Sequence, residues 1–214
     1  MGAYSPGMDA LGLFPLPLVL VPTERLPLHI FEPRYRELIG ECIDTGGEFG
    51  LVLATGDGAV HEVGTRAAVT DVIEKLEDGR LNVVVEGRER FRLLELTSGR
   101  AFATALVEPV EDDESDPADP DDVERALRIF HELAETAGAE IELSGASPQL
   151  AWQLAAHVDL GADPKQELLA LTSPRVRMKR LCELLALALE ALRAGAAIRE
   201  RASGNGKVEP PGSV

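Results

Sequence analysis

The sequence predicts an α+β protein in which a strand-rich N-terminal domain precedes a helical C-terminal domain. Short β-type runs separated by turn residues fill the stretch from Phe49 to Val107, and beyond residue 122 apolar residues recur at helical spacing. Between the two, residues 108–122 carry nine acidic side chains and no basic ones. The expected organisation is a β domain at 9–108, an acidic, Pro-containing linker at 109–122, a helical bundle at 123–200 and a disordered tail at 201–214.

The first element is expected to be an extended segment over residues 13–21. Pro15 and Pro17 each remove a backbone donor, which predicts an edge strand. These prolines and Pro22 also interrupt the apolar run, and no Lys or Arg precedes Glu24. The pattern is therefore typical of neither a signal peptide nor a membrane span.

The next stretch, LPLHIFEPRYREL, begins as a strand and ends as a helix. Residues 28–31 are expected to form a short strand, after which Pro33 suits a first helical turn, where its missing N–H costs nothing. Gly46-Gly47 ends the predicted helix. Its buried stripe has the spacing i, i+3, i+4, i+7 and i+8, and consists of Tyr35, Leu38, Ile39, Cys42 and Ile43.

Five further strands are predicted, at residues 49–55, 65–76, 81–87, 89–96 and 101–110. Asp78-Gly79 predicts a hairpin with a type I′ turn. In the run ERFRLLEL, the charged Glu89, Arg90 and Arg92 flank Phe91 and Leu93, which predicts one solvent-facing side, where Arg90 and Arg92 lie, and one packed side. About six strands, one early helix and tight turns predict a small closed or partly closed barrel.

Helix starts are predicted where a capping side chain precedes a proline. The three pairs are Ser147-Pro148, Asp163-Pro164 and Ser173-Pro174, and Asp121 or Asp122 is expected to cap the first helix of the bundle. The last helix is expected from Pro174 to about residue 194. Its early cations, among them Arg175 and Arg177, stand at the unfavourable end of the helix dipole and are expected to pair with the acidic linker or another surface.

Composition narrows the possible partners and the cellular setting. With 37 acidic and 21 basic side chains, the net charge of -16 repels phosphate backbones and anionic membranes, so nucleic acid is an unlikely partner and no membrane partner is expected. Cys42 and Cys182 lie among apolar residues and are expected to be buried free thiols. These features indicate a cytoplasmic protein.

No set of residues with a recognisable chemistry emerges from the motifs. The sequence has neither a Gly-rich phosphate loop nor a Gly-x-Ser-x-Gly nucleophile turn. The four histidines lack metal-ligand spacing, and the acidic run DDESD lacks the glycine and terminal glutamate of a calcium loop. We therefore expect no catalytic residues, no cofactor and no metal.

Three stretches resemble a known family: LGLFPLPLVLVPTERLPLHIFEPRYRELI, VGTRAAVTDVIEKLEDGRLNVVVEGRERFRLLEL and, further on, WQLAAHVDLGADPKQELLALTSPRVRMKRLCELL. They are similar to the N-terminal, substrate-binding domain of Lon proteases, above all to stand-alone members, over about residues 11–190. The resemblance implies a PUA-like β pseudo-barrel followed by a helical bundle. It also implies recognition of unfolded or degron-bearing proteins without proteolysis, because the ATPase module and the Ser-Lys protease domain of full Lon enzymes have no counterpart in this sequence.

The long acidic linker departs from the compact junction expected of that family. It leaves the geometry between barrel and bundle open.

The corner at residues 26–38 supplies the candidate binding residues. His29 and Phe31 point opposite to the barrel-facing Leu28 and Ile30, because strand side chains alternate. We expect an apolar groove for a peptide, rimmed by His29, Phe31, Arg34 and Tyr35. The competing interpretation is purely structural, with this corner only closing the barrel and starting the helix.

The leading functional hypothesis is a non-catalytic module that captures exposed apolar protein segments, as an adaptor for a protease or chaperone. Two alternatives stay open. One is an enzyme acting on a small ligand in the cleft between barrel and bundle. The other is a PUA-like RNA binder that uses the run EGRERFRLLEL.

Overall fold

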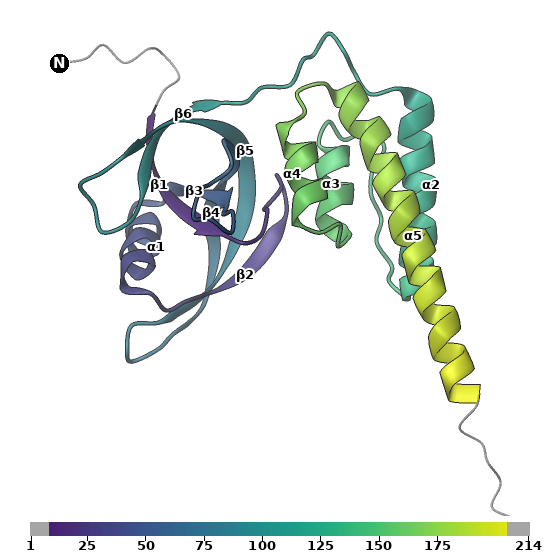
Figure 1. The fold of residues 1–214 in the computed structure, drawn as a ribbon, viewed down its shortest axis with the longest axis horizontal. Coiled ribbons are helices and arrows are strands. Elements are labelled where there is room, and N and C mark those ends of the chain that lie inside the picture. Colours follow the sequence, from purple (N-terminus) through teal and green to yellow (C-terminus); the bar gives the residue numbers. More distant parts are fainter. Residues whose placement is uncertain (1–8, 205–214) are drawn as a thin grey trace, which may run out of the picture.

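The computed structural model describes residues 9–204 as six strands followed by four further helices, with one helix inserted among the strands (Figure 1). The strands are β1 (Asp9–Leu16), β2 (Arg25–Ile30), β3 (Glu48–Leu53), β4 (Val63–Lys75), β5 (Leu81–Thr97) and β6 (Thr104–Pro109). The helices are α1 (Pro33–Thr45), α2 (Pro120–Ala137), α3 (Leu150–His157), α4 (Ala162–Ala170) and α5 (Pro174–Gly204). The fold is thus mixed α+β in the predicted order.

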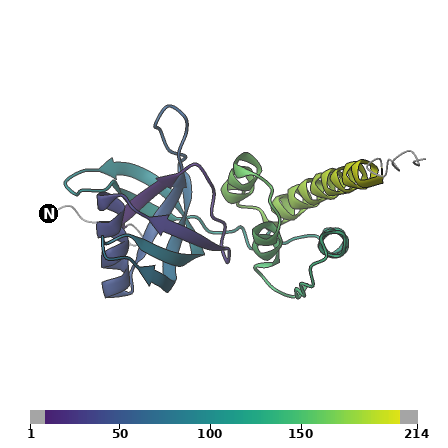
Figure 2. The same cartoon turned by 90° about the horizontal axis from the view of Figure 1, so that it is seen from below.

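The elements are arranged in layers. Helix α1 lies on one side of the strands, and α3 and α4 lie on the opposite side (Figures 1 and 2). Helices α2 and α5 lie beyond α3 and α4, farthest from the strands. The segment between β6 and α2 crosses from the strands to the outermost helix.

The six strands form one sheet in the order β2-β5-β4-β3-β1-β6, and β5 also pairs with β6. β1 is not an edge strand, so that prediction is wrong. Its first half pairs with β6, from Asp9 to Gly12, and its second half pairs in parallel with β3, from Leu13 to Leu16. Pro15 is tolerated because it lies in the second half of β1, which pairs with β3 alone, so its other side needs no backbone donor.

β5 is one continuous strand of 17 residues where the sequence suggested two. Gly87 does not end a strand. Instead, it pairs with Ala67 of β4, accepts a hydrogen bond from the Thr23 N–H and donates one to the Glu24 carbonyl. A Cβ at Gly87 would collide with the carbonyl oxygen of Val21, so this glycine permits the close approach of the loop between β1 and β2.

The hairpin between β4 and β5 is present at the predicted place, but its turn is not type I′. A type I′ turn needs two residues with positive φ, and here only Gly79 has one, at 83°. The Leu76 N–H donates to the Arg80 carbonyl across a three-residue loop. That geometry is typical of a type I turn followed by a left-handed glycine.

Helix α1 begins at Pro33 and ends at Thr45, with Gly46 as its C-cap at a φ of 66°, so the predicted start and stop signals are correct. Of the expected stripe, all but Ile43 are buried. The buried thiol of Cys42 is free, as is that of Cys182, as predicted. Burial raises the pKa of Cys42 to about 11, and the neighbouring Glu41 and Glu48 add to that increase.

The predicted caps are correct for one of the three Pro-containing pairs. The Ser173 hydroxyl accepts from the Val176 N–H at the start of α5. Ser147-Pro148 instead forms a turn before α3, and Asp163-Pro164 lies inside the first turn of α4.

The first helix of the bundle has a different cap from the predicted one. The cap of α2 is Asp119, whose carboxylate accepts from the Asp121 N–H; Asp121 and Asp122 lie within the first turn. Pro120 therefore takes the first helical position.

Three apolar cores hold the layers together. One lies between α1 and the sheet, and a small one lies among β1, β3, β5 and β6. The largest combines the helices with residues from the strand half, namely Val19, Val21, Leu53 and Val63. The strand and helix halves therefore share apolar burial.

Two expectations concern the end of the last helix and the tail. Helix α5 continues to Gly204, ten residues beyond the predicted end, so residues 201–204 are helical and not disordered. The remainder of the predicted tail, residues 205–214, lies outside the described residues.

Candidate binding site

The predicted corner lies at the end of an edge strand. β2 pairs with β5 alone, from Arg25 to Ile30. Outside the strand, Phe31 is 60% exposed, and its ring stacks on that of His29 with 6.0 Å between centroids. The His29 Nδ1 lies 2.6 Å from the Asn82 Oδ1, and the Asn82 amide donates to Glu74 at 2.9 Å. A chain of polar contacts across three strands therefore holds His29 beneath an exposed aromatic ring.

Arg34 also lies at the surface of this corner. Its guanidinium donates to the Glu32 carboxylate at 2.9 Å and lies 4.5 Å from the centroid of the Tyr35 ring. His29, Phe31 and Arg34 are therefore exposed, as the groove hypothesis requires.

Tyr35 does not belong to the rim. It is only 6% exposed, and its ring stacks on that of Phe14 with 4.1 Å between centroids. Burial raises the pKa of its hydroxyl, which Arg34 partly opposes. Tyr35 is the first residue of the buried stripe of α1, and its helical position turns it toward the sheet. The expectation of an exposed Tyr35 is wrong.

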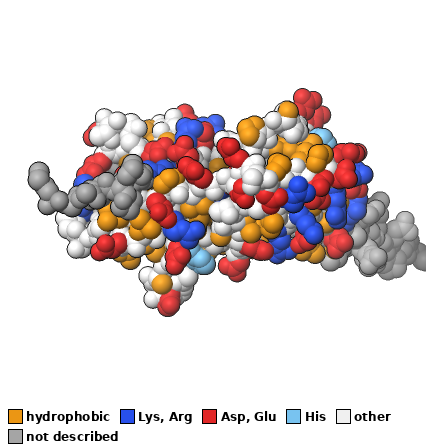
Figure 3. Space-filling view, turned by 90° about the horizontal axis from the view of Figure 1, so that it is seen from above, with side chains coloured by type: hydrophobic (Ala, Val, Ile, Leu, Met, Phe, Trp, Pro, Cys, Tyr) orange, Lys and Arg blue, Asp and Glu red, His pale blue; other side chains and the backbone are white. Residues whose placement is uncertain are grey.

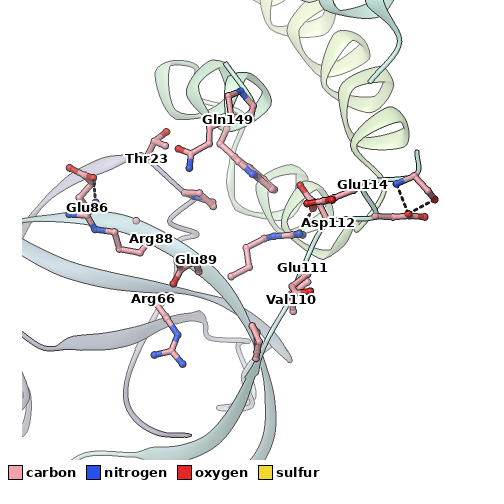
Figure 4. Close-up of a pocket in the computed structure, with 18 residues that line it drawn as sticks. Thr23, Arg66, Glu86, Arg88, Glu89, Val110, Glu111, Asp112, Glu114 and Gln149 are labelled. Atoms are coloured by element: carbon pink, nitrogen blue, oxygen red, sulfur yellow. Dashed lines mark hydrogen bonds and ion pairs between the residues drawn. The ribbon is translucent and has the colours of Figure 1, made fainter. Parts of the chain in front are cut away.

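A second surface, which the motifs did not reveal, is a cleft between the sheet and the helices (Figure 4). Its volume is about 1160 Å³. The sheet side contributes Thr23 and residues 86–90, the segment after β6 contributes residues 110–115, and the helical side contributes Gln149 and Trp152. In Figure 4, Glu86 and Arg88 approach from the sheet, and Glu111 and Glu114 from the segment that leads to α2.

Thr23 marks the sheet wall of this cleft with an unusual backbone. Its φ is 69°, and it is the one residue other than glycine with a positive φ among residues 9–204. For a β-branched residue this conformation is strained. It lets the Thr23 N–H reach the Gly87 carbonyl at 2.8 Å.

The inner end of the cleft holds a buried cluster of two arginines. The side chains of Arg90 and Arg177 are 4% and 3% exposed, and both guanidinium groups donate to the Asp112 carboxylate. They lie 5.3 and 4.3 Å from the centroid of the Trp152 ring. Arg90 also donates to the carbonyls of Leu169 and Leu171 at 2.8 and 2.7 Å. The Asp112 carboxylate thus joins β5 to α5, and the two arginines also bind the Leu171 carbonyl in the loop between α4 and α5.

The buried charges of this cluster do not cancel, because two guanidinium groups share the single carboxylate of Asp112. Burial lowers the pKa of Arg90 to about 10; Arg177 adds to this decrease and Asp112 opposes it. The Nε of Arg177 is buried without a hydrogen-bond partner among the described residues. The prediction that Arg90 faces solvent is wrong, because its guanidinium is buried against the Trp152 ring of α3 and the Leu169 carbonyl of α4.

The connecting segment (residues 110–119) is held by contacts along its length. The Asp113 N–H donates to the Thr172 carbonyl at 2.9 Å. Asp116 accepts from Ser173 at 2.6 Å and from the Arg175 Nε at 2.8 Å, and both contacts lower the pKa of its carboxyl. The predicted pairing of Arg175 and Arg177 with the acidic linker is confirmed. Counter-charge therefore helps to order this segment, together with the packing of Val110 and Ala118 against the largest core.

Further contacts fix α4 against the strand half. The Lys165 ammonium lies 2.6 Å from the Glu24 carboxylate, with both side chains largely buried. The Gln166 amide donates to the Val63 carbonyl at 3.0 Å. Together with the shared core, these contacts give strands and helices a defined relative position, which the sequence left open.

Two features are absent from the part of the chain that the structure describes. Within residues 9–204, no group of three or more His, Cys, Asp or Glu side chains is arranged to hold a metal ion. No helix in the same range is long and apolar enough to cross a membrane.

The fold has a counterpart among known proteins. It is similar to the crystal structure of a Lon N-terminal domain protein from Xanthomonas campestris. The TM-score is 0.64 and the identity 28%, over 81% of this chain and 96% of that chain. The class is therefore that of Lon N-terminal domains.

The family model for the substrate-binding domain of the ATP-dependent protease La (LON) matches residues 10–186, and the chain belongs to that family. It is 28% identical to Lon protease of Brucella suis over 220 residues, covering 94% of this chain and 27% of that protein. It is also 28% identical to Lon protease of Anaeromyxobacter dehalogenans over 187 residues, covering 78% of this chain and 22% of that protein. The chain thus spans about a quarter of the length of these relatives.

Proposed function

We propose that this chain is a non-catalytic module that binds exposed apolar segments of unfolded or degron-bearing proteins. The observation that carries the proposal is the match of residues 10–186 to the LON substrate-binding domain. That match covers most of the chain and both halves of its fold. Protein substrates follow from the family, and the preference for apolar segments is our inference from the corner.

The geometry of β2 supports this mode of binding. Its outer edge pairs with no strand in the described part of the chain. An extended segment can add to such an edge through backbone hydrogen bonds while side-chain contacts provide selectivity. Phe31 and His29 stand beside that edge, and a fixed, exposed aromatic ring is a typical anchor for an apolar side chain.

The cellular role that fits this activity is that of an adaptor. The relatives are proteases, and this chain corresponds to about a quarter of their length. We propose that it presents bound segments to a protease or a chaperone in the cytoplasm, without hydrolysing them itself.

We interpret the circuit of pairings from β5 through β4, β3, β1 and β6 back to β5 as the PUA-like pseudo-barrel that supports the site.

The test is a binding titration with a fluorescent, permanently unfolded protein, comparing the wild type with Phe31→Ala. We expect the Kd to rise about 5- to 30-fold, the range of a hot-spot side chain. Tyr35 is not a suitable second mutation because it is buried. The matched control is Leu187→Ala, since Leu187 is an apolar side chain of similar exposure, 59%, on α5.

The control should change the Kd less than about twofold. If both variants bind as the wild type does, the corner is not the site. If the wild type itself does not bind the unfolded protein, the proposed function is wrong.

A further inference from the structure

The cleft between sheet and helices is large enough for a stretch of polypeptide. Its volume of about 1160 Å³ exceeds the roughly 300–1,000 Å³ of pockets that hold drug-sized ligands. It is open along one side, and its walls come from three separate parts of the chain. The cleft therefore has the volume to accommodate part of an extended segment.

The charges that line the cleft are not balanced within the molecule. Each lining cation has a carboxylate partner: Arg66 pairs with Asp9, Arg88 with Glu86, and Arg90 with Asp112. Four lining carboxylates have no ion pair among the described residues, namely Glu89, Glu111, Asp113 and Glu114. The cleft therefore presents an excess of negative charge to any occupant.

Three of these four carboxylates lie on a segment whose backbone is anchored. Asp112 is turned inward to the two buried arginines, and the Asp113 N–H donates to the Thr172 carbonyl. The backbone that bears Glu111, Asp113 and Glu114 is therefore tied to the rest of the protein, while their side chains are exposed. Like charges on one anchored segment repel one another, and an incoming cation relieves this repulsion without a reordering of that backbone.

The rest of the wall suits the stems of long cationic side chains. Pro22, Pro109 and Pro148 line the cleft together with Val110 and Trp152. Lys and Arg pack their methylene stems on such apolar surfaces while their charged ends reach polar groups. Figure 3 shows acidic and apolar side chains next to one another across the middle of the face along which the connecting segment runs.

We infer that this cleft binds a basic segment of the protein substrate, with Lys or Arg side chains paired to Glu89, Glu111 and Glu114. The inference rests on the proposed function, because it assumes that the ligand is a polypeptide. It adds a second contact to the one at Phe31: an apolar part of the substrate binds at the corner, and a basic part binds in the cleft. Substrates that combine the two features bind most tightly.

The test uses three fluorescent peptides of equal length, built from Leu and Ser with Lys, Gln or Glu at the same positions. We expect the Lys peptide to bind at least about tenfold more tightly than the Gln peptide at about 50 mM salt, and to lose most of that advantage at about 300 mM salt. The Glu peptide should bind more weakly than the Gln peptide.

The variant Glu89→Gln/Glu111→Gln/Glu114→Gln should weaken binding of the Lys peptide about five- to tenfold. The matched control is Glu77→Gln/Glu95→Gln/Glu142→Gln, which removes the same charge from exposed residues that do not line the cleft. The control should change binding less than about twofold.

Equal losses in the two variants would show a general charge effect and overturn the inference. Equal binding of the Lys and Gln peptides would overturn it as well. In either case, Phe31-dependent binding of the unfolded protein would leave the proposed function intact. If the protein neither binds the unfolded protein nor prefers the Lys peptide, both the proposed function and this inference are wrong.

Discussion

Neighbouring residues of one short stretch have opposite environments, and the difference sets what each can do. Phe31 follows the last residue of β2 and projects into solvent, whereas Tyr35 lies one helical turn later and stacks on Phe14 in the core. Arg34 covers the outer face of the Tyr35 ring. Of the two aromatic side chains, Phe31 is thus exposed and Tyr35 packs in the core.

This contrast predicts opposite effects on stability. Tyr35→Ala should lower the free energy of unfolding by about 3 kcal/mol, because it leaves a cavity beneath α1. Phe31→Ala should change it by less than about 0.5 kcal/mol, because little of its surface is buried. Urea denaturation of the two variants measures both values. A large loss in Phe31→Ala would show that its ring packs in the folded protein and would weaken its assignment as a binding anchor.

At the scale of elements, the connecting segment shows how an acidic run can be ordered without an apolar stripe. Its composition predicts a solvated linker, yet Asp112, Asp116 and Asp119 each contact an arginine of β5 or α5. The two arginine partners of Asp112, Arg90 and Arg177, lie 22 and 65 positions away from it in the sequence. The order of the connecting segment therefore depends on arginines that only the folded chain brings close to it.

Asp112→Ala should lower the free energy of unfolding by about 3 kcal/mol. The change leaves Arg90 and Arg177 buried beside each other without a counter-charge, a situation that costs several kcal/mol. Asp113→Ala is the matched control, because among the described residues its carboxylate has hydrogen bonds with Ser115 alone, and it should cost less than about 0.5 kcal/mol. Equal effects in urea denaturation would mean that the arginine cluster is not the element that secures the segment.

For the whole molecule, the two halves share one core, so they are expected to unfold together. Val19, Val21, Leu53 and Val63 of the strand half pack in the same cluster as the helices, and Lys165 pairs with Glu24 across the junction. Neither half can lose its structure without exposing apolar surface of the other. This coupling also keeps the corner and the cleft at a fixed separation, as binding of one segment at both surfaces requires.

Unfolding should therefore give one transition whichever half is observed. The single tryptophan, Trp152, reports on the helices, and labelling of the Cys42 thiol in a Cys182→Ser background reports on the strands. In the native state the Cys42 thiol is buried and its pKa is raised to about 11, so near pH 8 it reacts only when the strand half opens. We expect the two urea midpoints to agree within about 0.2 M. Separated midpoints would show two independent folding units.

The sequence by itself determined the local structure of this protein. The helical stripe from Tyr35 to Cys42, the Gly46 end of α1, the hairpin at Gly79 and the Ser173 cap of α5 depend on neighbouring residues, and a neighbour's effect can be read from spacing and residue type. The resemblance of three stretches to Lon N-terminal domains likewise identified the family that the match over residues 10–186 shows.

Only the tertiary structure decided which charges are buried and where the surfaces meet. Alternation along β5 placed Arg90 toward solvent, but α3 and α4 cover that face and turn it into the buried partner of Asp112. The strained Thr23, the close approach at Gly87 and the cleft beside them arise from contacts between segments far apart in the chain. Burial is a property of what packs against a residue, and residue order does not record it when the packing partners are distant.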